Sequence, residues 1–166
     1  MADTLIIYYS LEGNIDFLMR ALAKQSSADT CRLETVKEYP KKGLLKFLHG
    51  GRDASFGFKP ELKTALPDMA QYSRIIIGTP VWAGKPSAPI MSFLDKADFS
   101  GKNVTIVASS AGGSADKCVN IITTAVTAKG GIVNGSYAFV NPLKNPQDSL
   151  DKITEIAEQI TAQSNA

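Results

Sequence analysis

Short apolar segments of strand length alternate along this chain with longer amphipathic segments, and no other feature limits the possible folds as much. The run LIIYY at 5–9 contains no charged position and is followed by a turn. A strand that is apolar on both faces must be covered on both, which is typical of a parallel sheet between layers of helices. Further strands are expected at 29–35, 73–78, 103–108 and 132–140.

Two of these expected strands carry additional information. The segment 29–35 alternates apolar and polar residues, which indicates an edge strand with one solvated face. The apolar run at 73–78 leads into Gly78-Thr79-Pro80. We expect this strand to end there, because glycine and proline commonly interrupt strands.

Between the expected strands, apolar residues recur at intervals of three and four, the spacing of one helical face. Ile15, Leu18 and Leu22 show this spacing in the first such segment. Helices are expected at 14–25, 88–96, 115–128 and 148–163. Strands and helices that alternate in this order form a parallel, doubly wound α/β sheet. The length of 166 residues suits one domain spanning 1–166.

The stretch 37–66 does not fit this alternation, because it is too long for a simple connection between a strand and a helix. Between 37 and 63 it holds seven Lys and Arg residues against three Asp and Glu, a net charge of +4 in a chain of net charge +2. We expect an irregular basic insertion, with a short helix at 43–50 and then a glycine-rich loop that contains Phe56 and Phe58. It either faces an acidic partner or an anionic substrate, or is a solvated loop that blunts a sheet edge.

Charge, cysteine and hydropathy patterns exclude several classes of protein. A net charge of +2 is too small to predict nucleic-acid binding, and no apolar run approaches the length of a membrane span. Cys31 and Cys118 are far apart and His49 is the only histidine. The sequence therefore indicates no metal site, no histidine-dependent triad and no redox dithiol. These features predict a reduced, cytoplasmic protein.

Three of the expected strands end in loops of small and polar residues, at 10–15, 79–85 and 109–114. The carboxyl ends of parallel strands share one edge of the sheet, where open α/β sheets bind ligands. The first loop leads into the start of a helix, whose free N–H groups and dipole suit an anion. The second holds Trp82, the only tryptophan, which offers a flat surface to a planar ring.

Each loop alone also fits a plainer interpretation: a capped turn, a tryptophan that fills a gap, and a flexible connector. Together the loops provide an anion site, an aromatic surface and a wall of small residues at one edge of the sheet. This combination predicts a phosphorylated, planar ligand.

The chain resembles flavodoxins, and among them the flavodoxin-like proteins and FMN reductases of bacteria, over nearly its whole length. The resemblance is carried by IIYYSLEGN at 6–14, IIIGTPVWAGKPSAPI at 75–90 and VASSAGG at 107–113. It implies a three-layer α/β/α fold whose five-stranded parallel sheet has the order 2-1-3-4-5. FMN would bind beyond the strands, at the point where that order reverses.

The resemblance also implies which residues hold FMN. The phosphate would be bound by Ser10, Leu11, Glu12, Gly13, Asn14 and Ile15. The ring would be bordered by Thr79, Pro80, Val81, Trp82, Ala83 and Gly84, with Trp82 stacking on it. The polar ring edge would contact Ser109, Ser110, Ala111, Gly112 and Gly113. No catalytic side chain is expected, because the flavin itself carries out the redox chemistry.

The first loop departs from the family at Glu12 and Ile15, where flavodoxins usually have serine or threonine. A carboxylate held ~6 Å from a phosphate charge would oppose binding by about 3 kcal/mol at an effective dielectric constant near 20. Glu12 would avoid most of this repulsion by pointing to solvent or by pairing with a lysine. The N–H groups of the loop remain, so FMN is still the expected cofactor.

The implied function is electron transfer or an FMN-dependent oxidoreductase reaction. Expected partners are a redox partner protein or a small-molecule electron acceptor, with NAD(P)H as a candidate donor, and the chain would act as a monomer or homodimer. Carrier flavodoxins are typically acidic, and the charge of +2 differs from that pattern. The alternative is a flavodoxin-fold interaction module without redox activity, which the changes at Glu12 and Ile15 would favour. Neither nucleic acid nor a membrane is an expected partner.

Overall fold

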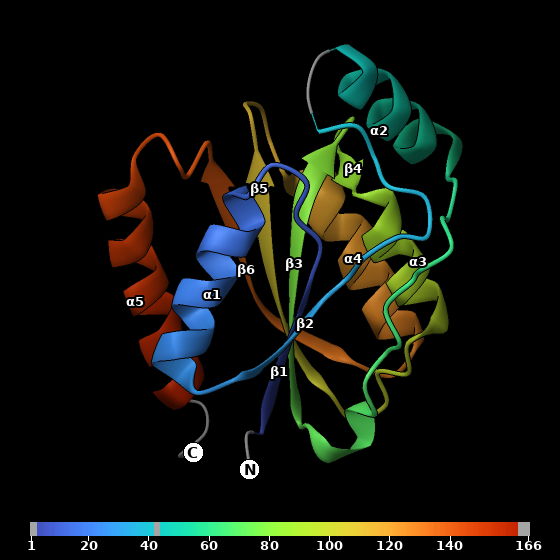
Figure 1. The fold of residues 1–166 in the computed structure, drawn as a ribbon. Helices are drawn as coiled ribbons and strands as arrows, with labels where there is room; N and C mark the ends of the chain where they lie inside the picture. The colour runs from blue at the N-terminus through green and yellow to red at the C-terminus, as the bar shows by residue number, and fades with distance from the viewer. Residues whose placement is uncertain (1–2, 42–43, 163–166) are drawn as a thin grey trace.

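A twisted parallel sheet forms the middle layer of the molecule in the computed structural model, which describes residues 3–41 and 44–162 (Figure 1). Its strands are β1 (Thr4–Tyr8), β2 (Asp29–Arg32), β3 (Arg74–Trp82), β5 (Asn103–Ser110) and β6 (Ile132–Val140). They pair in parallel in the order β2-β1-β3-β5-β6. The short β4 (Lys85–Pro86) pairs only with β3, in an antiparallel hairpin. The predicted sheet order is therefore confirmed, with β5 and β6 as its fourth and fifth strands.

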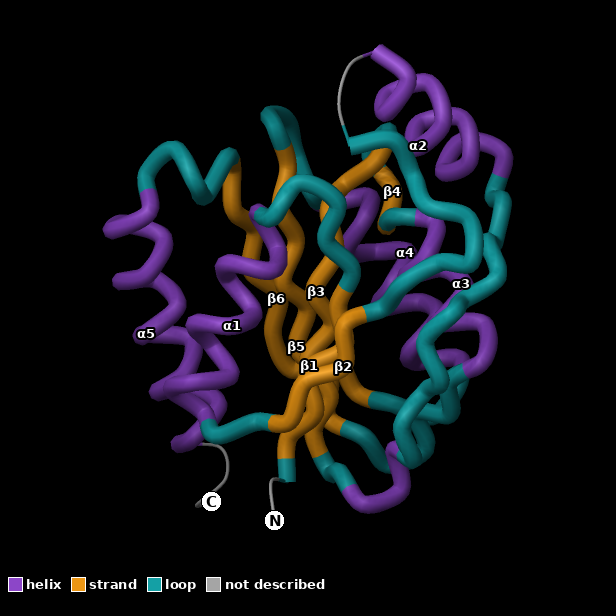
Figure 2. Tube along the Cα trace, viewed as in Figure 1, coloured by secondary structure: helices purple, strands orange, loops and turns teal. Residues whose placement is uncertain are grey.

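Helices cover both faces of this sheet, so the predicted three-layer arrangement is confirmed (Figure 2). One face is covered by α1 (Asn14–Ser26) and α5 (Pro146–Ala162), and the other by α3 (Ala88–Lys96) and α4 (Asp116–Ala128). A further helix, α2 (Leu44–Phe56), lies beside β4 at the edge where the parallel strands end (Figure 1). The short 3-10 helix Met69–Gln71 lies at the opposite end of the sheet.

Strand β1 shows why the sequence forms a sheet buried on both sides. All five of its residues are buried. Ile6 and Tyr8 belong to the core beneath α1 and α5, whereas Leu5 and Ile7 belong to the core beneath α3 and α4. Side chains of a strand alternate between its faces, so one apolar run supplies both cores.

Gly78 sets how closely α1 approaches the sheet. A Cβ atom at this position would lie 2.8 Å from the Met19 sulfur and 2.9 Å from Cβ of Tyr8. Only a residue without a side chain fits there, so α1 packs directly against the backbone of β3. This contact fixes where the amino-terminal end of α1 lies relative to the strand ends.

The expected end of the third strand at Gly78 is wrong, because β3 continues to Trp82. Thr79 and Pro80 stay in the sheet by pairing with Ala108 and Ser109 of β5. Beyond Gly78 the described pairing of β1 with β3 has ended, and proline is tolerated where a strand has a neighbour on one side only. Pairing with a distant strand therefore overrides the local signal to stop.

The expected glycine-rich loop after residue 50 is also wrong. Helix α2 runs from Leu44 to Phe56 and includes both Gly50 and Gly51, whereas position 43 of the expected helix lies outside the described residues. The expected strand at 29–35 is shorter, because β2 ends at Arg32. Beyond it Thr35 forms an isolated bridge to Leu62. The edge position predicted for β2 is confirmed.

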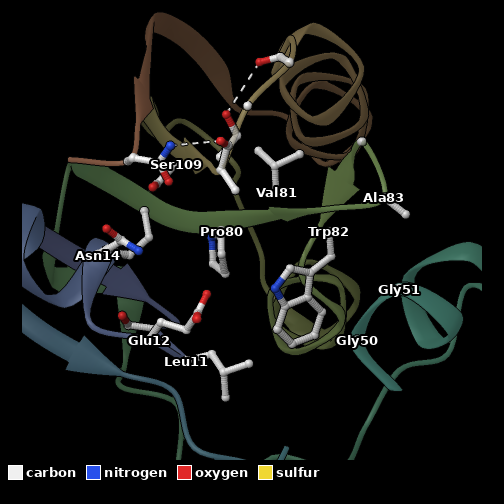
Figure 3. Close-up of a pocket in the computed structure, with 18 of the residues that line it drawn as sticks. Leu11, Glu12, Asn14, Gly50, Gly51, Pro80, Val81, Trp82, Ala83 and Ser109 are labelled. Atoms are coloured by element: carbon white, nitrogen blue, oxygen red, sulfur yellow. Dashed lines mark hydrogen bonds between the residues drawn. The ribbon is translucent and has the colours of Figure 1, made fainter. Parts of the chain in front are cut away.

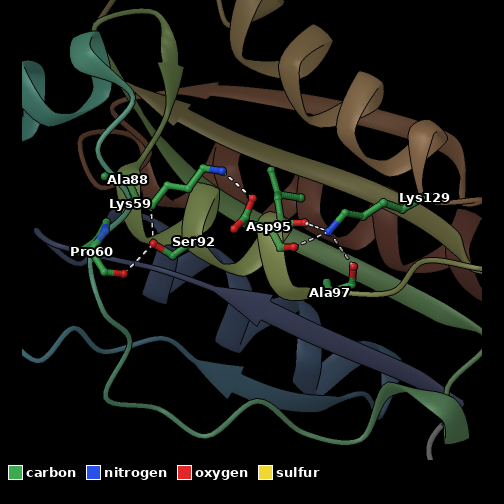
Figure 4. Close-up of polar contacts among 8 residues, drawn as sticks. Lys59, Pro60, Ala88, Ser92, Asp95, Ala97 and Lys129 are labelled. Atoms are coloured by element: carbon green, nitrogen blue, oxygen red, sulfur yellow. Dashed lines mark hydrogen bonds and ion pairs between the residues drawn. The ribbon is translucent and has the colours of Figure 1, made fainter.

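The chain that follows α2 is fastened to α3 by polar contacts (Figure 4). Lys59 Nζ lies 2.5 Å from an Asp95 carboxylate oxygen, and the buried Ser92 hydroxyl donates to the Pro60 carbonyl at 2.7 Å. Lys129, just after α4, donates to three carbonyls at the end of α3 (Leu94, Asp95 and Ala97). The contacts of Lys59 and Pro60 hold the segment that follows α2 against α3, and those of Lys129 join α4 to the end of α3.

Candidate functional site

A cavity of about 480 Å³ lies beyond the carboxyl ends of β1, β3 and β5 (Figure 3). All three loops predicted from the sequence line it. Of the residues assigned to the cofactor, all except Gly13 and Thr79 are among its lining residues. Four lining residues were not predicted: Gly50, Gly51, Ser114 and Asn141. Its size is within the usual range for small-molecule and cofactor sites.

The first loop presents the start of α1 to the cavity. The Ser10 hydroxyl is buried and accepts a hydrogen bond from the Asp16 N–H at 3.1 Å, which satisfies one donor in the first turn of α1. Within the described chain, the N–H groups of Asn14 and Ile15 donate to no backbone carbonyl. Free donors at a helix start, together with the positive end of the helix dipole, form a site for an anion.

The two unusual residues of this loop take different positions. The Ile15 side chain is buried in the core under α1, so this residue can offer a ligand its N–H group but no hydroxyl. Glu12 is exposed, and in Figure 3 its side chain extends in the direction of Pro80. A hydrated carboxylate is screened by water and salt, which lowers the repulsion expected between Glu12 and a bound phosphate.

Trp82 forms an aromatic wall of the cavity. Its ring makes edge contacts with Tyr39, at a centroid distance of 5.0 Å, and with Tyr9, at 5.7 Å. In Figure 3 it lies between Pro80 and Leu11 on one side and α2 on the other. A Cβ atom at Gly50 of α2 would lie 3.3 Å from two carbons of the indole. Trp82 therefore both fills the gap beneath α2 and lines the cavity.

A tight turn holds Trp82 in this place. Ala83 and Gly84 both have positive φ angles, 49° and 76°, and connect β3 to β4 as a two-residue hairpin turn. Lys85, the next residue, donates from Nζ to the Ser55 carbonyl near the end of α2 at 3.1 Å. The hairpin and α2 are thus linked on the outer side of the cavity.

Thr79 lies away from the cavity in spite of its prediction as a ring contact. It is fully buried, and its hydroxyl oxygen accepts a hydrogen bond from the Ser87 N–H at 3.1 Å. The same hydroxyl donates to the Pro80 carbonyl at 2.9 Å. Thr79 therefore joins the start of α3 to β3. Gly13, the other predicted residue outside the lining set, has a φ angle of 95° and shapes the turn into α1.

The third loop is held from the end of β6 by Asn141. The Asn141 N–H donates to the Ser110 carbonyl at 2.9 Å, and its side-chain amide donates to the Ala111 carbonyl at 2.8 Å. Its φ angle of 44° is one that asparagine tolerates better than most residues. The predicted parallel sheet already puts the end of this strand at the same edge, so the residue after it could have been assigned to the site from the sequence.

Three further features considered in the sequence are the two phenylalanines of the insertion, a metal site and a membrane-spanning helix. Phe56 is 84% exposed and Phe58 55% exposed, and the described lining of the cavity includes neither. Among residues 3–41 and 44–162, no cluster of three or more His, Cys, Asp or Glu side chains could hold a metal ion. In the same part of the chain, no helix has the length and apolar character needed to cross a membrane.

These lining groups fit FMN. The start of α1 offers N–H groups for a phosphate, Trp82 offers an aromatic surface for a ring system, and the third loop offers backbone groups for a polar ring edge. A Cβ atom at Gly112 would meet nothing within 4 Å, so this loop leaves space toward its surroundings.

A family model described as NADPH-dependent FMN reductase matches residues 3–145. The chain belongs to this family. Two curated relatives are both named NAD(P)H dehydrogenase (quinone). The protein from Cupriavidus metallidurans is 29% identical over 102 residues, which are 58% of this chain and 47% of that protein, so this chain matches only about half of its length. The protein from Rhodopseudomonas palustris strain BisA53 is 26% identical over 166 residues, covering 93% of this chain and 78% of the relative.

Solved structures show the same fold. A flavoprotein from Lactobacillus acidophilus NCFM in complex with FMN has a TM-score of 0.70 at 22% identity, over 87% of this chain and 98% of that chain. Flavodoxin 2 from Bacillus cereus has a TM-score of 0.64 at 18% identity, over 98% and 99%. Membership in the FMN reductase family confirms the predicted family, the FMN cofactor and the flavin-dependent redox function. No comparison favours the interaction module without redox activity.

Proposed function

We propose that this member of the FMN reductase family takes electrons from NAD(P)H and passes them to a small-molecule acceptor. The observation that carries the proposal is one cavity with an anion-binding helix start, an aromatic wall and an open glycine-containing loop, in a chain whose family is described as NADPH-dependent. The relatives named NAD(P)H dehydrogenase (quinone) support the same donor and make a quinone the first acceptor to test.

In this proposal each wall of the cavity has one task. The N–H groups of Asn14 and Ile15 bind the phosphate of FMN, the Trp82 indole orients the ring, and the loop held by Asn141 contacts the ring edge. When bound, FMN supplies the redox chemistry by accepting and releasing electrons, and the protein supplies position and electrostatics. No side chain of this chain needs to transfer a proton.

The glycines of the cavity leave room for a second ligand. Gly51 and Gly112 both line it, and a Cβ atom at either would meet nothing within 4 Å. We place the donor and then the acceptor in this open part, beside α2. Trp82 and α2 would limit the access of water to the same space, which protects a reduced cofactor from side reactions.

The charge distribution supports a small anionic donor more than a role as an acidic carrier. The segment 37–63, with a net charge of +4, contains α2, and α2 contributes Gly50 and Gly51 to the cavity. Pyridine nucleotides are anions, and a basic surface beside a cleft raises their encounter rate. A chain of net charge +2 lacks the acidic surface with which a carrier docks on basic partners.

Anaerobic stopped-flow reduction of the FMN-loaded protein with NADPH or NADH tests the proposal. We expect rapid bleaching of the flavin with at least one of them, followed by reoxidation when a quinone is added. Quenching of Trp82 fluorescence provides the binding control, because this is the only tryptophan and it lines the cavity. Protein that binds FMN by this criterion but is reduced by neither nucleotide would contradict the donor assignment.

A further inference from the structure

We infer that Arg32, at the end of the edge strand β2, is a positioning residue that holds the 10–15 loop in the conformation that binds the phosphate of FMN. The inference rests on the proposed function, which puts the phosphate at this loop. It explains how the loop can bind a phosphate although Glu12 and Ile15 offer no hydroxyl group. With Glu12 and Ile15 there, phosphate binding depends chiefly on backbone N–H groups. Such groups bind well only if the backbone is held in place.

Arg32 contacts both ends of the loop. Its Nη2 donates to the Ser10 carbonyl at 3.2 Å, and its Nη1 donates to an Asp16 carboxylate oxygen at 3.2 Å. Ser10 is where the chain leaves β1, and Asp16 is in the first turn of α1. The planar guanidinium can make both contacts at once, which a lysine ammonium cannot do with the same geometry.

Asp16 receives this contact because it is itself fixed. The Tyr8 hydroxyl donates to the same carboxylate oxygen at 2.7 Å, and the Asp16 N–H donates to the Ser10 hydroxyl at 3.1 Å. Burial raises the pKa of Tyr8 to about 12, with the neighbouring carboxylate adding to the shift, so the phenol remains a donor. Two strands, β1 and β2, thus hold the loop through one carboxylate.

The charges of this cluster do not distinguish the two arginines. Arg20 and Arg32 each pair with Asp16, so each contributes one positive charge beside the same carboxylate. Attraction of a phosphate by charge alone would therefore give them similar roles. What Arg32 adds is its bond to the loop backbone.

Arg20 is a matched control within the same cluster. Its Nε lies 3.0 Å from the second carboxylate oxygen of Asp16, and in the described structure it makes no hydrogen bond to the backbone of the 10–15 loop. Its side chain is 73% exposed, against 43% for Arg32. Removing either arginine removes one positive charge beside Asp16, but only removal of Arg32 releases the loop.

The test compares binding of FMN with binding of riboflavin, which lacks the phosphate, in the unaltered protein and in Arg32→Ala, Arg32→Lys and Arg20→Ala. Dissociation constants come from quenching of flavin fluorescence and of Trp82. We expect Arg32→Ala to weaken FMN binding about tenfold or more and riboflavin binding about twofold or less, as loss of a charge-assisted hydrogen bond would. Arg32→Lys keeps the charge and should show most of the same loss, whereas Arg20→Ala should change both constants about twofold or less.

Each of the following outcomes would overturn either the positioning role of Arg32 or the phosphate site itself. If Arg20→Ala and Arg32→Ala weaken FMN binding equally, the effect comes from the lost charge and not from the position of the loop. If Arg32→Ala weakens the binding of FMN and of riboflavin equally, the effect is general damage to the cavity. If neither dissociation constant changes, Arg32 has no positioning role. If the unaltered protein itself binds FMN no better than riboflavin, the phosphate site under the proposed function is wrong, and the role of Arg32 falls with it. Thermal unfolding shows whether each variant is folded. If Arg32→Ala does not fold, FMN binding by Arg32→Lys tests whether Arg32 positions the loop.

Discussion

The two sides of the cavity are built differently. On one side, the α1 wall consists of the 10–15 loop and the start of α1, and its Ser10 and Ile15 are almost fully buried. On the other, the α2 wall consists of Trp82 and α2, where Trp82 is half-buried and Phe56 is 84% exposed. The α1 wall is continuous with the core of the sheet, as suits a permanently bound cofactor. In the α2 wall, Trp82 packs against the other core of the sheet, but α2 leaves open space at Gly51, as suits substrates that enter and leave.

The largest expected effect comes from filling the contact that fixes the α1 wall. Gly78→Val would place new atoms within 3 Å of the Met19 side chain and of Cβ of Tyr8, and a Cβ atom is fixed by the backbone of its strand. We expect the free energy of unfolding to fall by about 3 kcal/mol or more, and FMN binding to be lost as α1 shifts. Denaturant unfolding and flavin fluorescence measure the two effects.

The same substitution in the α2 wall is the control. At Gly51 an added Cβ atom meets nothing within 4 Å, and valine and glycine differ by only about 0.5 kcal/mol in helix propensity. Gly51→Val should therefore leave stability nearly unchanged. If both variants lose similar stability, the two walls do not differ in the way that the packing indicates.

The same contrast explains what could be predicted from the sequence. The α1 wall could be predicted because its signals are local. They are an apolar run, a turn at a glycine and the spacing of a helical face, all between residues 5 and 25. The α2 wall depends on contacts between distant segments: Pro80 stays in β3 because β5 pairs with it, and Gly50 stays helical where it packs on Trp82. Glycine and proline predict interruption when only neighbours in sequence are considered, so these two features were missed.

Alkaline unfolding examines both walls at once. Burial raises the pKa of Tyr8 and of Tyr9 to about 12, and it also raises the pKa of Tyr39, whose hydroxyl donates to Asp53. Unfolded tyrosines ionise near 10, so these phenols keep their protons longer in the folded protein. The resulting stability is fully present below pH 10 and is lost as the pH rises toward 12, by on the order of 2 kcal/mol per tyrosine.

Denaturant unfolding over this alkaline range, with tyrosinate absorbance followed in the folded protein, measures the effect. Tyr8→Phe removes the phenol that donates to Asp16 of the α1 wall, and Tyr39→Phe removes the phenol beside Trp82 of the α2 wall. Each should reduce the loss of stability above pH 10. Folded protein in which all tyrosines titrate together near pH 10 would contradict the burial of these phenols.

A smaller effect is expected from substitutions of Asn141, the residue that holds the third loop. Asn141→Ala removes the hydrogen bond to the Ala111 carbonyl and puts a residue that disfavours positive φ at 44°. Together these should lower the free energy of unfolding by about 2 kcal/mol and weaken flavin binding. Asn141→Gly accepts the φ angle but lacks the amide, so it should lose about half as much. Equal losses in the two variants would mean that backbone strain contributes nothing.

The smallest expected effect is a gain in stability, in the α2 wall. Gly51 lies inside α2 and has open space around it, and glycine within a helix is less favourable than alanine by about 0.5–1 kcal/mol. Gly51→Ala should raise the free energy of unfolding by that amount and leave FMN affinity unchanged, because it alters none of the groups that we propose hold the cofactor, which are the start of α1, Trp82 and the third loop. The rate of reduction by NAD(P)H is the decisive measurement: it should fall if the donor uses the open space at Gly51. A more stable variant that is reduced at the original rate would move the donor away from Gly51 and leave this part of the α2 wall without an assigned ligand.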